Sequence, residues 1–130
     1  MTPNRIAATA GAVLFAALGV WGLTAALSPA DPQLGPLVAW VFGTSVPLAA
    51  LHLVIALALA AGAIRSERLA RPTNVTAGTV LLLLGMAGLF VVSTPANVLG
   101  LNGADNALHF AAASGLLATG LGARKPAPDA

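Results

Sequence analysis

Residues 46–64 read VPLAALHLVIALALAAGAI, a run without a charged side chain. A helix needs about 17–25 mostly apolar residues to cross the roughly 30 Å hydrocarbon core of a bilayer. Strands of membrane barrels alternate apolar and polar residues, whereas this run is continuously apolar. Pro47 suits the first turn of a helix, where its missing N–H has no partner to lose. The sequence therefore predicts a transmembrane helix over residues 46–64.

Three other apolar runs predict spans over residues 6–27, 75–93 and 105–122. The composition agrees, because 58% of the 130 residues are hydrophobic and only 8% are charged, whereas soluble domains are about 25% charged. We expect an all-α, polytopic membrane four-helix bundle. Residues 1–130 form a single membrane domain in this interpretation, with a disordered tail at 126–130. The first run exceeds the 7–15 apolar residues typical of a signal peptide, so we expect a retained span.

The positive charges indicate the orientation of the predicted bundle. All six fall on one side of it: Arg5, Arg65, Arg68, Arg71, Arg124 and Lys125. The loops on the other side, residues 28–45 and 94–104, contain neither Lys nor Arg. Lys and Arg are enriched in cytoplasmic loops. The sequence therefore predicts a multi-pass protein of the cell membrane with both termini in the cytoplasm.

Composition also excludes several classes of partner. The sequence pI of about 10.6 is high, but the basic residues are dispersed at helix ends and do not form a nucleic-acid-binding stripe. The chain has no Cys, which excludes disulfides, iron–sulfur clusters and thiolate zinc sites. The lipid bilayer is the expected surrounding, and nucleic acid is not an expected partner.

The segment 34–44 is apolar but too short to cross a membrane. We expect it to lie at the outer interface, with Trp40 at the level of the lipid headgroups, where aromatic residues are enriched. A re-entrant hairpin is the alternative interpretation.

The two histidines indicate an internal repeat. Aligning His52 with His109 matches Ala50-Leu51-His52-Leu53 to Ala107-Leu108-His109-Phe110. The first and third runs also correspond, since Gly19-x-x-Gly22-Leu23 matches Gly85-x-x-Gly88-Leu89. We expect two parallel repeated helical hairpins related by an axis along the membrane normal. The alternative is chance similarity between apolar helices rich in Ala, Leu and Gly.

Polar residues enter the predicted membrane region at one place. The candidate polar cluster consists of His52, Asp105, Asn106 and His109. Asp105 and Asn106 lie four and three residues before His109, so all three share one helical face. The structural interpretation makes Asp105 the N-cap of the fourth helix and gives Asn106 and His109 hydrogen bonds between helices. We expect His109 to face the bundle interior, near Asp105 and towards the helix of His52.

A second interpretation of this cluster is a cofactor site. Two imidazoles that face each other can be axial haem ligands, and His with a carboxylate suits a transition metal. Two His and one Asp form a small ligand set, so we predict no cofactor, no metal site and no catalytic residue, with haem or metal as the alternative.

The run Asp105-Asn106-Ala107-Leu108-His109, preceded by Pro95-Ala96-Asn97, resembles a bacterial family of small four-span membrane proteins called domain of unknown function 4383. Gly19-x-x-Gly22-Leu23 and Leu51-His52 are also similar to it. The chain departs from the family where Leu48 and Ala49 stand, since members often have Asn before this Leu-His. The resemblance covers nearly the whole chain. It implies topology and a membrane location, and it implies no activity.

The sequence favours a non-enzymatic membrane scaffold or accessory subunit, because its loops are short and no catalytic motif is present. Other membrane proteins or a second copy of the chain are the expected partners. A small transporter or permeation protein is one alternative, based on the parallel repeat and the polar cluster. A haem- or metal-binding redox protein that uses His52 and His109 is the other.

Overall fold

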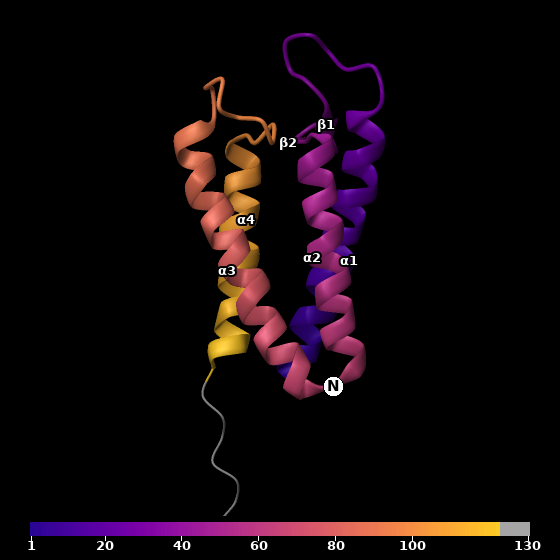
Figure 1. Cartoon of the computed structure of the whole chain (residues 1–130), viewed down its shortest axis with the longest axis vertical. Coiled ribbons are helices and arrows are strands. Elements are labelled where there is room, and N and C mark those ends of the chain that lie inside the picture. The colour runs from indigo at the N-terminus through magenta and orange to yellow at the C-terminus, as the bar shows by residue number, and fades with distance from the viewer. Residues whose placement is uncertain (123–130) are drawn as a thin grey trace, which may run out of the picture.

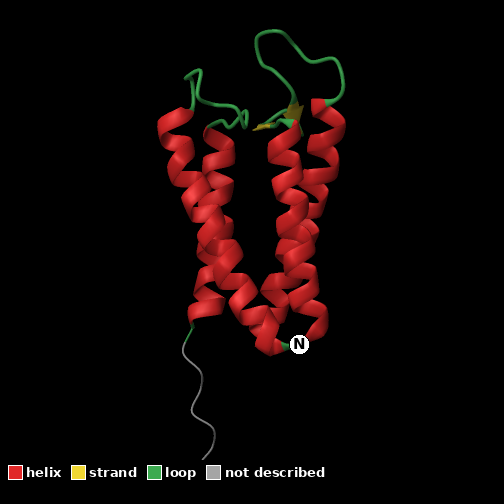
Figure 2. Cartoon of the chain, viewed as in Figure 1, coloured by secondary structure: helices red, strands yellow, loops and turns green. Residues whose placement is uncertain are grey.

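The computed structural model describes residues 1–122. The predicted tail at 126–130, Arg124 and Lys125 lie outside the described residues. Four helices account for most of the described residues (Figures 1 and 2). Their bounds are α1 Pro3–Ala26, α2 Val46–Arg65, α3 Glu67–Val91 and α4 Gly103–Leu121. The chain is an all-α helical bundle, as predicted, and α1, α2 and α3 are long and apolar enough to cross a membrane.

The helices form two hairpins. Helix α1 packs along α2, and α3 packs along α4. Figure 1 shows the hairpins close together at the end that carries the N-terminus and further apart towards the strands β1 and β2. We call the end with the N-terminus the inner end of the bundle and the end with the strands the outer end. Buried apolar side chains such as Phe15, Leu59, Leu81 and Leu116 form the core between the helices.

Burial follows the predicted repeat. With His52 set equal to His109, every buried position of α4 matches a buried position of α2. These pairs are Leu48 with Asp105, Ala49 with Asn106, His52 with His109, Ala56 with Ala113, Leu59 with Leu116, and Ala63 with Gly120. This agreement is what the predicted repeat requires, because equivalent helices turn equivalent faces to the core.

The buried positions of α1 and α3 also correspond. With Gly19 set equal to Gly85, every buried position of α1 matches a buried position of α3. These pairs are Asn4 with Ala70, Ala8 with Asn74, Phe15 with Leu81, Leu18 with Leu84, Gly19 with Gly85, and Gly22 with Gly88. The two hairpins therefore present equivalent faces to the centre of the bundle.

The connection at the inner end is shorter than the sequence suggested. Ser66 is both the C-cap of α2 and the N-cap of α3, and its side chain accepts the N–H of Leu69. Helix α3 thus begins eight residues before the predicted span and contains Pro72. Proline lacks an N–H and cannot bond the carbonyl four residues earlier. That carbonyl belongs to Arg68, which is exposed, so water is available to satisfy it.

The apolar segment 34–44 forms a small β-hairpin. Strand β1 (Leu37–Val38) pairs antiparallel with β2 (Phe42–Gly43). The turn residues Ala39 and Trp40 have φ angles of 51° and 58°. Strand β1 lies against α1, and β2 lies against α4. The hairpin therefore reaches from one helical hairpin to the other at the outer end.

Candidate functional site

A histidine pair joins the two helical hairpins. His52 lies in the second turn of α2 and His109 in the second turn of α4, and their Nε2 atoms are 3.1 Å apart. His109 is completely buried, and His52 is 4% exposed. Within residues 1–122 the backbones of α2 and α4 make no close contact. The two imidazoles bridge this separation, and His109 faces His52 as the sequence predicted.

The surroundings of the pair are aromatic and apolar on one side. The imidazole rings meet edge to face with a centroid distance of 5.4 Å. Phe15 of α1 packs on the ring of His52 at 5.2 Å. One Nε2 donates a proton and the other accepts it, so the two histidines carry their protons on different ring nitrogens when both are neutral.

Asp105 connects α4 to the β-hairpin. Its Oδ2 accepts the backbone N–H of Gly43 at 2.9 Å and that of Asn102 at 2.8 Å. The side chain of Asn102 in turn accepts the backbone N–H of Asp105 at 3.0 Å. This reciprocal arrangement is a capping box. The carboxylate of Asp105 therefore ties strand β2 to the start of α4.

This geometry corrects two expectations. Asn102 is the N-cap of α4, and Asp105 is the third residue of the helix. In the described part of the chain Asp105 forms no hydrogen bond with His109. The reason is geometric, because a carboxylate at the third helical position reaches back to the N-cap and so points away from the following turn.

Asn106 faces α3. It is 5% exposed, and its amide oxygen lies so close to Gly88 that a Cβ at that position would overlap it. The equivalent contact in the other hairpin joins Gly22 to Ala49 and Thr44. Within residues 1–122 the Asn106 side chain makes no hydrogen bond between helices, contrary to expectation, and it contributes to α3–α4 packing. His109 makes the contact between the hairpins.

The structure brings His52 and His109 into contact and places Asp105 and Asn106 on the turn before His109. Among residues 1–122, three buried polar atoms of this cluster find no hydrogen-bond partner: Asp105 Oδ1, Asn106 Oδ1 and His109 Nδ1. All three belong to α4. The equivalent positions of α2 carry Leu48 and Ala49, so the cluster is polar mainly on one side of the repeat axis.

The separation of the pair fits a hydrogen bond better than axial ligation of a haem iron. Two axial imidazole nitrogens on opposite sides of the iron, each at about 2.0 Å, would lie about 4 Å apart. The observed Nε2 separation is 3.1 Å. A ligating imidazole also donates its second N–H to a carboxylate or carbonyl, whereas Nδ1 of His109 has no partner. Within residues 1–122, no three His, Asp or Glu side chains gather as a metal-ligand set.

A second polar cluster at the inner end was not predicted. Thr2 and Asn4 donate hydrogen bonds to the carboxylate of Glu67, the latter at 2.7 Å. Asn74 is completely buried and donates to the backbone oxygen of Asn4 at 2.9 Å. Asn74 directly precedes the predicted third span, so the signal in the sequence was an amide side chain next to an apolar run.

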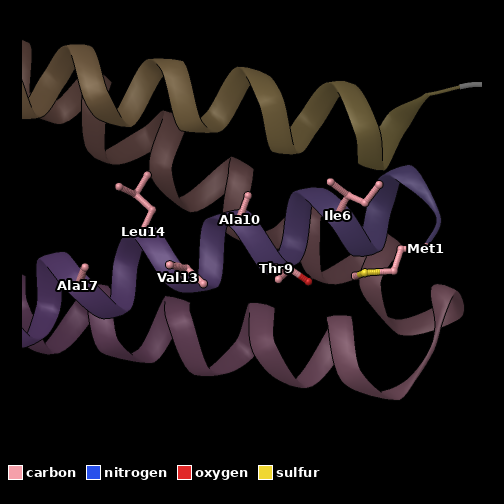
Figure 3. A pocket seen from close by; sticks show the side chains of 7 residues that line it. All are labelled: Met1, Ile6, Thr9, Ala10, Val13, Leu14 and Ala17. Atoms are coloured by element: carbon pink, nitrogen blue, oxygen red, sulfur yellow. The ribbon is translucent and has the colours of Figure 1, made fainter.

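Helix α1 borders two apolar hollows. One, of about 700 Å³, is open and runs along α1 beside Met1, Ile6, Thr9, Ala10, Val13, Leu14 and Ala17 (Figure 3). The other, of about 350 Å³, lies between α1 and α4. Phe15 and Leu116 form part of its lining, and both are buried. The side of the bundle formed by α1 and α4 is therefore grooved.

Comparison with known proteins gives one match. No curated protein and no solved structure matches the sequence. The model of a family described as domain of unknown function (DUF4383) matches residues 5–122. This range includes both hairpins, the histidine pair and the capping box, and it agrees with the resemblance seen in the sequence. The chain belongs to the DUF4383 family.

Proposed function

We propose that the protein crosses the cell membrane four times, with both termini in the cytoplasm, and acts there as a non-enzymatic scaffold or accessory subunit. Three apolar helices support the membrane location. Helix α4 has 19 residues, or roughly 28 Å at 1.5 Å per residue, which is close to the thickness of the hydrocarbon core. Asp105, Asn106 and His109 are buried in the bundle, and the exposed Ser114 donates its hydroxyl to the carbonyl of Phe110, so the span brings few unpaired polar groups to lipid.

The observation that carries the scaffold role is the groove between α1 and α4. Small side chains line both of its walls: Ala7, Ala10 and Gly11 from α1, and Ala112, Gly115 and Thr119 from α4. Small residues allow helices in a membrane to approach closely. A Cβ added at Gly115 would meet no heavy atom within 4 Å. We propose that the groove binds a transmembrane helix of another membrane protein.

The repeat supports this choice of occupant. The equivalent side of the bundle lies between α2 and α3, and there a helix already packs tightly. A Cβ at Gly62 would lie 3.0 Å from Thr73 Oγ1 and 3.2 Å from Ala70 Cα. Helices α2 and α3 thus pack directly on each other, whereas α1 and α4 leave a groove between them. A helix from a partner would fill this groove.

The polar groups of the outer end support a structural role for the cluster. Asp105 holds backbone N–H groups, the histidines hold each other, and Ser45 Oγ donates to the carbonyl of Leu99 at 2.8 Å. These contacts engage Asp105 Oδ2, the two Nε2 atoms and Ser45 Oγ in bonds within the protein. Transport and redox functions remain the alternatives stated from the sequence, and the geometry favours them less.

Site-specific photocrosslinking at native expression tests the partner. Leu14 lines both hollows, so a photoreactive residue there should give one discrete adduct with another membrane protein. Gly115→Leu should abolish that adduct by filling the groove. Leu57, exposed on α2, is the matched control and should give none. An adduct that forms equally from Leu57, or that survives Gly115→Leu, would overturn the groove as the binding site.

Reporter fusions test the topology separately. A reporter active only in the cytoplasm should give signal when fused after Lys125 and none when inserted within residues 34–43. The reverse pattern would reject the four-span orientation, because the positive charges would then lie outside.

A further inference from the structure

The two hairpins are joined differently at the two ends of the bundle. At the inner end Ser66 alone connects α2 to α3, and Asn74 bonds the backbone of Asn4. At the outer end, where the hairpins diverge in Figure 1, the helices are linked by side chains and the β-hairpin. Among residues 1–122, one of these links, the bond between His52 and His109, is made by two imidazoles, and each imidazole can take up a proton.

The bond between the histidines tolerates one extra proton but not two. At 3.1 Å the two Nε2 atoms share a single proton. A neutral pair supplies that proton, and so does a pair with one imidazolium. When both imidazoles are charged, two N–H donors face each other, the hydrogen bond is lost, and the like charges repel across a short distance in a poorly screened interior.

The elements around the pair offer little to compensate two charges. Helix α1 presents Phe15 to His52. Helix α3 presents Gly88 beside Asn106, and β2 presents the N–H of Gly43 to Asp105. None of these groups on α1, α3 or β2 is an anion.

Two carboxylates lie towards the outer end. Asp105 is on α4, and its Oδ2 is held by two backbone N–H groups. Asp31 lies in the loop before β1, where its Oδ1 accepts the N–H of Gln33 and Leu34. Asp105 lies on the turn of α4 before His109 but reaches back to the N-cap, so a doubly charged pair has no anion to face.

We infer that the His52–His109 pair is a proton-binding site that controls the outer end of the bundle. Uptake of a second proton by the pair breaks its bond and lets the hairpins separate at that end, while the inner end stays closed. The inference concerns the centre of the bundle and does not rest on the helix-binding groove between α1 and α4.

Distance measurements between spin labels test it directly. The chain has no Cys, so two introduced cysteines carry the only labels. Leu27 at the end of α1 and Phe90 in the last turn of α3 are exposed and mark the two hairpins at the outer end. In lipid nanodiscs their separation should increase by several ångström between pH 8 and pH 3, a range wide enough to charge both imidazoles, whose ordinary pKa is about 6.5.

Two controls make the result specific. Labels at Ile64 and Leu121, exposed near the inner end, should keep their separation at both pH values. His109→Gln retains an amide that can bond His52 but cannot form a second imidazolium, so the change at the outer end should disappear. An outer separation that is the same at pH 8 and pH 3 in the protein with both histidines would overturn the inference. A change that persists in His109→Gln would do so too, and if that variant does not fold, the comparison of outer and inner labels decides.

Discussion

Arg5 and Arg71 occupy equivalent positions in the two hairpins and make the same contact. Nε of Arg5 donates to the carbonyl of Ala63 at 2.7 Å, near the end of α2. Nε of Arg71 donates to the carbonyl of Gly120 at 2.8 Å, near the end of α4. The last carbonyls of a helix lack intrahelical partners and carry partial negative charge. Each guanidinium therefore stabilises a helix C-terminus and ties it to the neighbouring helix.

Removing either contact should destabilise the bundle. We expect Arg5→Ala and Arg71→Ala each to lower the free energy of unfolding by about 1.5–3 kcal/mol, as for hydrogen bonds to charged groups. Arg68 is exposed and makes no hydrogen bond to residues 1–122. Arg68→Ala should therefore change the free energy of unfolding by less than about 0.5 kcal/mol. Denaturant titration in detergent measures all three, and equal losses would contradict the capping role.

Gly88→Ala should destabilise the protein through Asn106. A Cβ at position 88 would overlap the Asn106 amide, and overpacking of this kind costs about 1–3 kcal/mol. Adding Asn106→Ala should recover most of that loss, and a double-mutant cycle measures the recovery. The matched control is Gly115→Ala, because that Cβ meets no heavy atom within 4 Å. We expect Gly115→Ala to be neutral or to gain up to about 1 kcal/mol from helix propensity. Loss of stability without recovery by Asn106→Ala would disprove the clash.

Asp105→Ala should loosen the β-hairpin. It leaves the N–H groups of Gly43 and Asn102 without their acceptor, at about 1–3 kcal/mol for each buried group. Asp105→Asn keeps one side-chain oxygen and should lose less. Hydrogen exchange gives a local reading, since the Gly43 amide should exchange faster in Asp105→Ala than in Asp105→Asn. Equal protection of Gly43 in both variants would show that Asp105 does not hold the hairpin.

The sequence was sufficient to predict the helices and the pairing of the histidines. Continuous apolar runs predict α1, α2 and α3. The matched Leu-His dipeptides indicate the repeat, and in the structure this repeat places His52 next to His109. Both features depend on local pattern and on symmetry. The equivalence of Arg5 and Arg71 follows from the same repeat, but a contact to a backbone carbonyl leaves no sign in the sequence at Ala63 or Gly120.

The outer loops and the inner polar cluster could not be predicted. The short apolar segment before α2 contains a hairpin whose turn is Ala39-Trp40, without the Asn-Gly or Asp-Gly signal of such turns. Its position depends on Asp105, which is far away in the sequence. Likewise Asn4 and Asn74 meet only because α1 and α3 pack at the inner end. Contacts of this range arise from tertiary packing, which local pattern does not contain.

Trp40 should insert into the outer membrane interface. It is 86% exposed and has a φ of 58°, a conformation that is unfavourable for a bulky residue. So exposed a side chain buries little of its surface within residues 1–122, whereas the headgroup region favours amphipathic rings. In the Trp21→Phe variant Trp40 is the only tryptophan, and its fluorescence in vesicles should be quenched more by lipids brominated near the headgroup than by lipids brominated deep in the chain. Quenching by aqueous iodide alone would place Trp40 in water and contradict the prediction.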